Sequence, residues 1–317
     1  MAKFITRRIL LGILTLFAVA VIVFVATQAL PGNAAQAILG KSATPARVHA
    51  LERQLHLNES VFSQFTHWLG GILTGNLGTS AATQEPVSQL LSGRIVNSAF
   101  LVFVAAIIAI PLSIAFGSWM AVKRDTAVDY VGSTVSLVFA SLPEFVIGIA
   151  LVLLFATSVF HVLPAVSLIP PGDHAWDHPN AVILPAATLI LAVTPYISRI
   201  MRGSMVEVLE SDYVTMARLK GLPERTVIVR HAVPNAIVPA IQVSALQLAW
   251  MAGGIVLVEV VFSFPGVGAL LVDAVGNRDV PTVQALALII AAVYVVLNLA
   301  ADVLTILVTP RLRTAER

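Results

Sequence analysis

The stretch IVNSAFLVFVAAIIAIPLSIAFGSWMAV, residues 95–122, contains no charged side chain. A helix of this length is about 42 Å long, and the hydrocarbon core of a bilayer is about 30 Å thick. The stretch therefore predicts a membrane-spanning helix. The whole chain agrees, because 58% of its 317 residues are hydrophobic and only 11% are charged, whereas soluble domains carry about 25% charged residues. A soluble fold of this size could not bury so much apolar surface, which excludes soluble enzymes, disordered chains and fibrous repeats.

Further apolar runs lie on both sides of this stretch. They cover residues 9–29, 130–163, 181–198, 232–258 and 280–301. The run 130–163 is interrupted only by Glu144, and the run 181–198 is the shortest and contains two prolines. Each run has about the 20 residues that a spanning helix needs, or more. We therefore predict an all-α membrane protein with six transmembrane helices.

The basic residues predict the orientation of these helices. With six spans and a cytoplasmic N-terminus, five of the nineteen Lys and Arg residues would lie outside, which leaves fourteen (19 − 5) on the cytoplasmic side. The outer five are Lys41, Arg47, Arg53, Arg94 and Arg278. Cytoplasmic segments of membrane proteins carry such an excess of positive charge. We therefore expect both termini in the cytoplasm.

The segment 31–94 is polar enough to fold outside the bilayer. Thr44 and Pro45 precede a predicted short helix over 47–57, and residues 62–73 predict an amphipathic helix that ends at Gly75. The sequence GNLGTS, residues 75–80, predicts a turn. A segment of this length exceeds what a simple connection needs. It is either a docking or gating surface or a plain connector.

Motifs of nucleotide, covalent and thiol chemistry are missing from the sequence. Gly40, Lys41 and Ser42 resemble the end of a phosphate-binding loop, but the first glycine of that motif would be residue 35, which is Ala35. The chain has no cysteine, and we find neither Gly-x-Ser-x-Gly nor His-Glu-x-x-His. We predict that the chain is not itself an enzyme and that any ATP is bound by a partner. A net charge of +2 is too small to suggest nucleic acid.

The predicted outer loop 161–180 carries two histidines and two aspartates within six residues, namely Asp173, His174, Asp177 and His178. Such side chains can bind a metal ion. Prolines and a glycine flank them, which is also typical of a solvated irregular turn. We interpret the loop as a turn and predict no metal site.

The predicted inner segment 199–235 has helical periodicity outside the membrane. Apolar residues from Met205 to Met216 recur at helical spacing, and charged residues lie between them. Gly221 predicts the end of this amphipathic helix. Residues 224–233 predict a second short helix that Pro234 ends. The segment is either a basic loop that sets orientation or a rigid knob for a cytoplasmic partner.

Three acidic residues lie in or near apolar runs: Glu144, Glu259 and Asp302. A charge at this depth costs about 2.5–3.5 kcal/mol and by default marks a pathway or a polar network. Glu259 begins the sequence EVVFSFPGVG, residues 259–268, in which Pro and Gly predict a break in the helix. The three acids are candidates to line a pathway or gate, and interhelical hydrogen bonds or interfacial positions are the structural alternative.

Several motifs resemble one family of transporters. The stretch DYVTMARLKGL, residues 212–222, is similar to the coupling loop, or EAA loop, of ATP-binding-cassette (ABC) importer permeases, in the version of the dipeptide/oligopeptide permease family. The general pattern is Glu-Ala-Ala, three residues, Gly, nine residues, then Ile-x-Leu-Pro. Ala217, Gly221 and Pro234 match it, and Thr215 stands in place of the Glu.

The resemblance to this family runs through the whole chain. It includes Arg7-Arg8, LPGN at 30–33, HWLGGILTGNLGTS at 67–80, Glu85-Pro86-Val87, EVVFSFPGVG at 259–268, Asn277-Arg278-Asp279, Asp302-Val303-Leu304 and PRLR at 310–313. The family usually has Asp at the position of Thr309. The long segment after the first helix is similar to the first of the two permease subunits of such systems.

The resemblance implies a type I ABC importer permease fold in a bacterial cytoplasmic (inner) membrane. Its parts would be a first helix (1–30), an extracytoplasmic segment (31–94) and a permease core (95–317) that contains the coupling loop (204–235). The implied partners are a sibling permease, two cytoplasmic ATPases that hold ATP and Mg, an extracytoplasmic substrate-binding protein and the lipid bilayer. The implied function is import of peptides or a similar small solute, with substrate selectivity set largely by the binding protein.

The resemblance also assigns roles to residues. The residues implied in ATPase coupling are Asp212, Thr215, Ala217, Arg218, Lys220, Gly221, Arg230 and His231, and we expect Arg218 and Lys220 to pair with acidic groups of the ATPase. The residues implied in the pathway or gate are Glu144, Glu259, Phe262, Pro265, Gly266 and Asp302. Those implied in docking the binding protein are Arg278 and Asp279. The alternative function is a proton-coupled secondary transporter that uses Glu144, Glu259 and Asp302.

Overall fold

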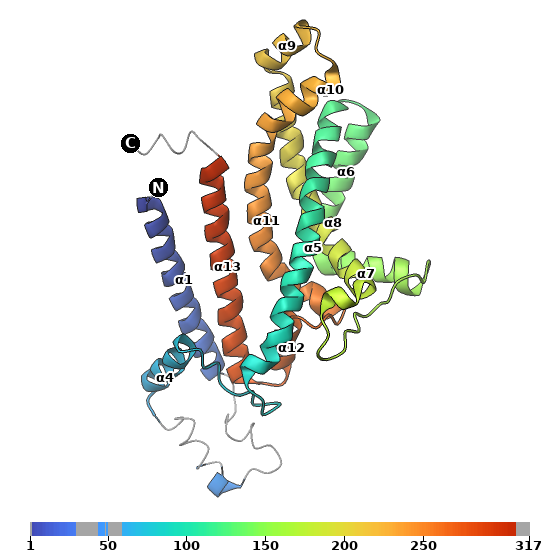
Figure 1. The fold of residues 1–317 in the computed structure, drawn as a ribbon. Helices are drawn as coiled ribbons and strands as arrows, with labels where there is room; N and C mark the ends of the chain where they lie inside the picture. The colour runs from blue at the N-terminus through green and yellow to red at the C-terminus, as the bar shows by residue number, and fades with distance from the viewer. Residues whose placement is uncertain (1, 30–43, 48, 50–58, 309–317) are drawn as a thin grey trace.

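The computed structural model describes residues 2–29, 44–47, 49 and 59–308, and the secondary structure of this part is helical apart from one isolated β-bridge. Several predicted features lie outside the described residues. These are most of the helix 47–57, the motif at 30–33, residues 40–42 and the motif at 310–313. Figure 1 shows the long helices running along one axis, with α9 at one end and α4 towards the other. We call these the knob end and the opposite end.

Within the described residues, five helices are long and apolar enough to cross a membrane. Four of them are α1 (Ala2–Gln28), α5 (Val87–Val122), α8 (Pro179–Leu209) and α13 (Val280–Val308). The fifth is a continuous helix over Glu224–Val261, which consists of α10 (Glu224–Thr226), η4 (Val227–Ala232) and α11 (Val233–Val261). A sixth span is a bent pair of helices. Its first half is α6 (Ala127–Ser141), and its second half is the helix Glu144–Thr157, which consists of α7 (Glu144–Val152) and η2 (Leu153–Thr157). The predicted all-α membrane fold is therefore confirmed.

The sixth span is broken, which the sequence did not predict. Its two halves meet at an angle of 105°. Leu142 and Pro143 are both extended between them, because the residue before a proline is sterically driven away from the helical region. Glu144 is the first residue of the second half. The expectation of one helix interrupted only by Glu144 was wrong, since Pro143 causes the break.

The prolines of α8 and Pro234 do not end their helices. α8 continues through Pro185 and Pro195 to Leu209, about 46 Å in all, so it projects beyond a bilayer. The residues predicted to begin a separate amphipathic helix, from Met205 to Leu209, belong to α8. Pro234 lies in the first turn of α11, after the π-helical η4. A proline in a first turn removes no hydrogen bond that the helix needs, so the predicted stop at Pro234 was wrong.

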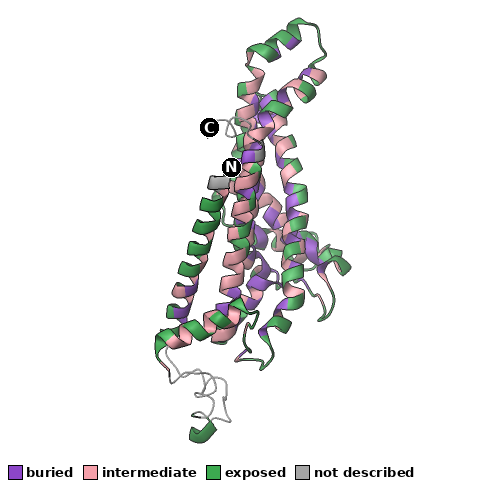
Figure 2. Cartoon of the chain, turned by 60° about the vertical axis from the view of Figure 1, so that its left-hand side comes forward, coloured by how far each residue is buried: buried purple, intermediate pink, exposed green. Residues whose placement is uncertain are grey.

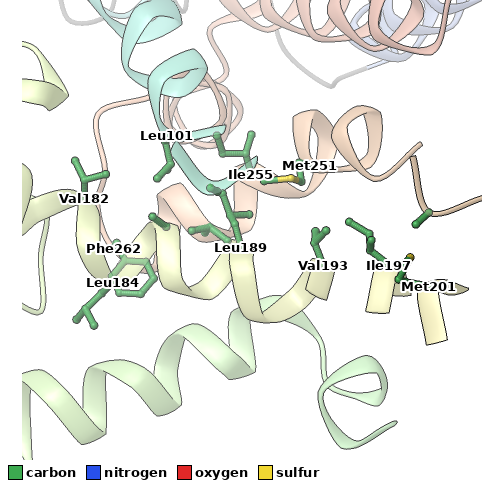
Figure 3. Packing of buried hydrophobic residues seen from close by; sticks show 14 of the residues in the cluster. Leu101, Val182, Leu184, Leu189, Val193, Ile197, Met201, Met251, Ile255 and Phe262 are labelled. Carbon is green, nitrogen blue, oxygen red and sulfur yellow. The ribbon is translucent and has the colours of Figure 1, made fainter. Parts of the chain in front are cut away.

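α8 is the central helix of the bundle and packs against α5, α6, α7 and α11. Figure 3 shows Leu189 of α8 beside Leu101 of α5 and Ile255 of α11, and Ile197 further along α8 beside Met201, all within one buried apolar cluster. α5 approaches α8 closely, because any side chain in place of Gly117 would collide with the backbone of Ser198. Small residues permit such close packing between membrane helices.

α1 and α13 form a peripheral pair (Figure 1). Arg8 Nε lies 3.1 Å from Asp302 Oδ2 near one end, and Gln284 Nε2 donates to Thr27 Oγ1 at 2.7 Å near the other. Figure 2 shows that the outward side of α1 is largely exposed. This pair therefore presents an apolar surface to lipid or to another membrane subunit.

The segment before α5 contains the predicted amphipathic helix. α4 (Val61–Leu73) begins after Ser60, whose hydroxyl accepts a hydrogen bond from Ser63 N at 3.3 Å. After the helix the chain turns at Gly75, with φ +85°, a conformation that favours glycine. The β-bridge between Thr79 and Pro86 then leads into α5. The predicted helix 62–73 and the turn 75–80 are confirmed.

Candidate functional site

The knob at the end of α8 is a compact helical hairpin. α9 (Asp212–Leu219) follows α8 after a short turn, and the chain then passes through Gly221 into α10. Gly221 has φ +76°, a left-handed conformation that costs other residues about 1–2 kcal/mol. Inside the hairpin Val214, Ala217 and Val227 form a small buried apolar cluster. The knob is therefore a packed unit and not a loose loop.

Arg218 closes the knob from inside. Its Nε and Nη2 donate to the two carboxylate oxygens of Glu224 at 3.1 and 2.7 Å, and its Nη1 donates to the carbonyl of Leu209 at 3.4 Å. The hydrogen bond to Glu224 raises the pKa of Arg218 above its ordinary value. We expected Arg218 to pair with an ATPase, but here its partner lies in its own chain. The fork geometry of a guanidinium explains this pairing.

The outward face of α9 is apolar and exposed. Tyr213, Met216 and Leu219 recur every three residues, so they share one face. Leu219 is 76% exposed and Met216 55%. Of the other predicted coupling residues, Asp212, Thr215 and Lys220 are exposed at the rim of this face, while Arg230 and His231 lie on η4. The knob thus combines satisfied charges with exposed apolar side chains.

Two ion pairs, which the sequence analysis missed, fix the base of the knob. Asp129 of α6 accepts from Arg202 Nε and Nη2 of α8 at 2.5 and 2.6 Å, and its side chain is almost fully buried. Arg124, between α5 and α6, pairs with Glu210 at the end of α8, and this contact raises the pKa of Arg124. Arg124 and Arg202 stood out only as basic residues. Their partners lie more than 70 residues away, so no local pattern identifies them.

Glu259 is fully buried at the opposite end of the bundle. Ser98 of α5 donates to its Oε1 at 2.5 Å, and the backbone N–H groups of Gly268 and Ala269 donate to its Oε2 at 2.7 and 3.1 Å. These amides begin α12 (Val267–Gly276) and would otherwise lack partners. The carboxylate therefore caps α12 from a neighbouring helix, and the N-terminal end of the helix dipole favours a negative charge there.

The rest of the motif 259–268 is also built into the protein interior. Phe262 belongs to the main apolar core, and its carbonyl accepts from Ser167 N at 2.7 Å. The carbonyl of Pro265 accepts from Asn97 at 3.2 Å. Gly266 lies against the Glu259 carboxylate, so that any added side chain would collide with it. In this conformation the motif is a structural hub, as the alternative of interhelical hydrogen bonds predicted for Glu259.

The three acids predicted at membrane depth do not come together. Asp302 pairs with Arg8 between α13 and α1, far along the chain from the Glu259 network. Glu144 is half-buried at the break between α6 and α7. Among the described residues it makes no ion pair and no side-chain hydrogen bond. Glu144 is therefore the one of the three whose carboxylate is not engaged within the described part of the chain.

The residues predicted to dock a binding protein differ in exposure. Arg278 is exposed, with φ +54°. Asp279 is buried and accepts from Ser80 Oγ at 2.5 Å, Ala81 N at 2.8 Å and Thr282 Oγ1 at 2.7 Å. Asp279 therefore joins the segment after α4 to the start of α13. Its predicted role at a docking surface does not fit this burial.

The histidine and aspartate side chains of the loop before α8 make local contacts. His178 Nε2 lies 2.8 Å from Asp173 Oδ2, and Asp177 accepts from the backbone of His174 at 3.1 Å. In the part of the chain that the structure describes, no group of three or more His, Cys, Asp or Glu side chains is arranged to hold a metal ion. These contacts suit the predicted turn.

Two family models match the chain, one over residues 113–314, described as binding-protein-dependent transport system inner membrane component, and one over residues 1–95, described as the N-terminal part of such a membrane component. The chain belongs to this family. It is a permease subunit of an ABC importer and a multi-pass inner membrane protein.

Similar proteins include a probable peptide ABC transporter permease, y4tP, of Sinorhizobium fredii, which is 37% identical over 99% of this chain and 100% of its own length. The glutathione transport system permease GsiC of Salmonella choleraesuis is 36% identical, and that of Escherichia coli is 34% identical. Both alignments cover 99% of each chain. The predicted resemblance to peptide permeases is therefore confirmed.

Membership of this family decides between the two predicted functions. A binding-protein-dependent ABC permease works with ATPase subunits, a substrate-binding protein and a second permease. The alternative of a proton-coupled secondary transporter is displaced. The structure agrees, because two of the three acids proposed for proton coupling, Glu259 and Asp302, are held in fixed contacts. The permease is a membrane component of the importer.

Proposed function

We propose that α9 and the turn to α10 are the element through which the ATPase subunits drive this permease. The observation that carries this proposal is the exposed apolar face of Tyr213, Met216 and Leu219 on a helix that projects beyond the membrane. Exposed apolar patches of this kind mark protein interfaces. Gly221 leaves space for a close approach, since no atom lies within 4 Å of the position that a side chain would occupy.

The internal contacts of the knob support this role. A helix that is to transmit motion must be rigid, because a loose loop would absorb the displacement. The Arg218–Glu224 pair, the buried Val214–Ala217–Val227 cluster and the ion pairs at the base provide this rigidity. Lys220 is exposed beside the apolar face and is free to pair with an acidic group of the ATPase. Arg230 and His231 would extend this surface towards η4.

We propose that the knob end is cytoplasmic, with both termini on the same side. Basic residues are concentrated at that end, as the positive-inside rule requires. ATP and Mg would then be bound by the ATPases and not by this chain. The extracytoplasmic segment would be residues 31–94, between the first helix (1–30) and the permease core (95–317), and Arg278 would face the binding protein.

We propose that the imported solute is a short peptide or a peptide-like molecule. The support is that similar permeases are named for peptides and for glutathione, which is itself a tripeptide. The pathway would lie between this chain and its sibling permease. Glu144 is the best candidate to line it, because its carboxylate is unengaged within the described residues, at a break in a membrane helix. Non-helical backbone at membrane depth is tolerated where it faces protein or a water-filled cavity.

The coupling role is tested with Leu219→Asp in the complete importer reconstituted in vesicles. A charge at the most exposed side chain of the apolar face disfavours burial at the interface, so we expect the ATPases to be lost on purification and peptide uptake to fall to background. The matched control is Leu168→Asp, an 80% exposed leucine at the opposite end. It should retain both. Normal uptake by Leu219→Asp would contradict the proposal.

Substrate class is tested on the same vesicles. Uptake of a labelled dipeptide is measured alone and in competition with glutathione, with the cognate binding protein present. Uptake that depends on ATP and is reduced by unlabelled peptides supports the assignment. Uptake of unrelated solutes only would contradict the peptide assignment without affecting the coupling proposal, because the two experiments have different readouts.

A further inference from the structure

α4 lies across the axis along which the long helices of the chain run (Figure 1). Figures 1 and 2 show it lying across the end of α1 instead of along the bundle. Its sequence, VFSQFTHWLGGIL, contains no Asp, Glu, Lys or Arg. Gln64 accepts a hydrogen bond at 2.8 Å from Gln28, the last residue of α1. The helix is amphipathic without being charged.

Aromatic contacts give the depth of α4 along α1. The ring of Phe65 packs against both Phe24 and Phe17 of α1, with centroid distances of 5.3 and 6.2 Å. Phe17 lies eleven residues (28 − 17) before the end of α1, which is about 16 Å of helix. The Trp68 ring packs on Phe24 as well, at 5.7 Å. α4 therefore lies level with the last three turns of a membrane-spanning helix.

The surroundings of α4 at this depth are apolar and exposed. On α1, Ile22 is 65% exposed and Val25 is largely exposed too. On α4, Phe62 is 76% and Leu73 80% exposed. Eleven residues separate Phe62 from Leu73, so they lie on one face of the helix, with Thr66 between them. The exposed faces of α1 and α4 are thus continuous at one level of the molecule.

We propose that α4 is an interfacial helix embedded in the leaflet opposite to the knob, with the face of Phe62, Thr66 and Leu73 in contact with lipid acyl chains. Amphipathic helices lie in the plane of the interface with their apolar face in the acyl boundary, and α4 is an amphipathic helix whose polar residues are Ser, Gln, Thr and His in place of the usual Lys and Arg. Trp68, amphipathic and near the end of α1, suits the headgroup level at which tryptophan is enriched. We assign lipid as the occupant because the exposed apolar face of α4 lies beside the exposed apolar side of α1, a helix long enough to span the membrane.

This placement gives the segment before α5 a mechanical role. From α4 the chain passes through the turn at Gly75 to Ser80 and Ala81, which bind the buried Asp279 before α13. If α4 is anchored in lipid, it holds the connection from Gly75 to Ala81 at the membrane surface, beside the ends of α1, α5 and α13. The segment is then neither a plain connector nor a freely projecting docking arm.

The chain has no native cysteine, so single cysteines can be introduced and spin-labelled in the complete importer in lipid nanodiscs. The test positions are Phe62→Cys, Thr66→Cys and Leu73→Cys. The lipid control is Ile22→Cys on α1, and the water control is Ala82→Cys in the exposed turn after α4. Accessibility of each label to oxygen, which concentrates in lipid, and to a water-soluble nickel chelate is measured by power saturation.

We expect the three α4 labels to match the Ile22 label in oxygen accessibility and to show several-fold lower nickel accessibility than the Ala82 label. Nickel accessibility equal to that of the Ala82 label would place α4 in water and overturn the proposal. Low accessibility to both reagents would show that protein covers this face, which also overturns it. Because three exposed positions are labelled separately, failure of one variant to assemble does not prevent a decision.

Discussion

The knob and the Glu259 hub lie towards opposite ends of the permease and contain similar residue types. Each has a glycine at a break between helices and a carboxylate close to it. In the knob, Arg218 and Glu224 satisfy one another and apolar side chains point outward. In the hub, Glu259 is buried with three donors and the aromatic rings of Phe262 and Phe264 point inward. The first arrangement leaves a surface for a partner, whereas the second leaves none.

Residue types alone do not distinguish a structural role from a role in binding a partner, whereas the environments of the knob and the hub do. A carboxylate at membrane depth by default indicates a functional site, yet Glu259 has the environment of a helix cap. Exposed leucine and methionine residues are common on protein surfaces, yet on α9 they share one face of a rigid element. Substitutions in the hub should therefore affect stability first, and substitutions in the knob should affect coupling first.

The largest expected effect is that of Glu259→Ala. It leaves the N–H groups of Gly268 and Ala269 and the hydroxyl of Ser98 without their acceptor, and each buried unpaired group costs about 1–3 kcal/mol. We expect a large fall in the Tm of the purified permease complex. Glu259→Gln retains one acceptor oxygen and should fall less. A Glu259→Ala complex with unchanged Tm but no uptake would make Glu259 a pathway residue instead.

A smaller effect on stability, with a clear effect on transport, is expected for Arg218→Glu. An exposed ion pair contributes only about 0.2–1 kcal/mol, so the Tm should change little. The carboxylate introduced at position 218 would nevertheless repel that of Glu224 and open the knob, and peptide-stimulated ATP hydrolysis should drop several-fold.

The control for this prediction is the double substitution Arg218→Glu with Glu224→Arg, which restores an opposite-charge pair across the same gap. It should recover much of the stimulated ATP hydrolysis. If the double variant is as inactive as the single one, Arg218 acts through the ATPase and not through Glu224.

The smallest effect is expected for Gly221→Ala. There is space for the methyl group, but Gly221 has φ +76°, and alanine adopts this left-handed conformation at a cost of about 1–2 kcal/mol. Coupling should weaken moderately while the permease still assembles. Gly203→Ala, within α8 with no atom within 4 Å, is the matched control. It should be neutral or slightly stabilising, since alanine favours helix by about 0.5–1 kcal/mol over glycine. If Gly221→Ala and Gly203→Ala weakened coupling equally, the left-handed backbone conformation of Gly221 would not explain the effect.

Local sequence patterns predicted the elements of this fold well. Uncharged runs identified the spanning helices, because their length must match the bilayer. The amphipathic stretch 62–73 predicted α4, and Gly75 and Gly221 predicted helix ends, where the structure has positive φ. The break at Pro143 was missed, although the proline was visible, since long hydrophobic runs elsewhere in the chain continue through their prolines, as α8 does.

The contacts between residues far apart in the chain could not be predicted from the sequence. The pairs Asp129–Arg202, Arg124–Glu210 and Ser80–Asp279 join residues that are 73, 86 and 199 positions apart. No periodicity connects such positions, so Asp279 was assigned to a docking surface and Arg218 to a partner's acid. A single sequence indicates where charges lie along the chain, and only the packed structure shows which of them satisfy one another.

The most direct test of the distinction between knob and hub is site-specific photo-crosslinking in the intact, transport-active importer. A benzophenone side chain is introduced at Leu219 in the knob and, as the control, at the exposed Leu168 of the opposite end. We predict a crosslink from position 219 to an ATPase subunit and none from position 168. Absence of any ATPase crosslink from position 219, in a complex that still transports peptide, would contradict the assignment of α9 as the coupling element.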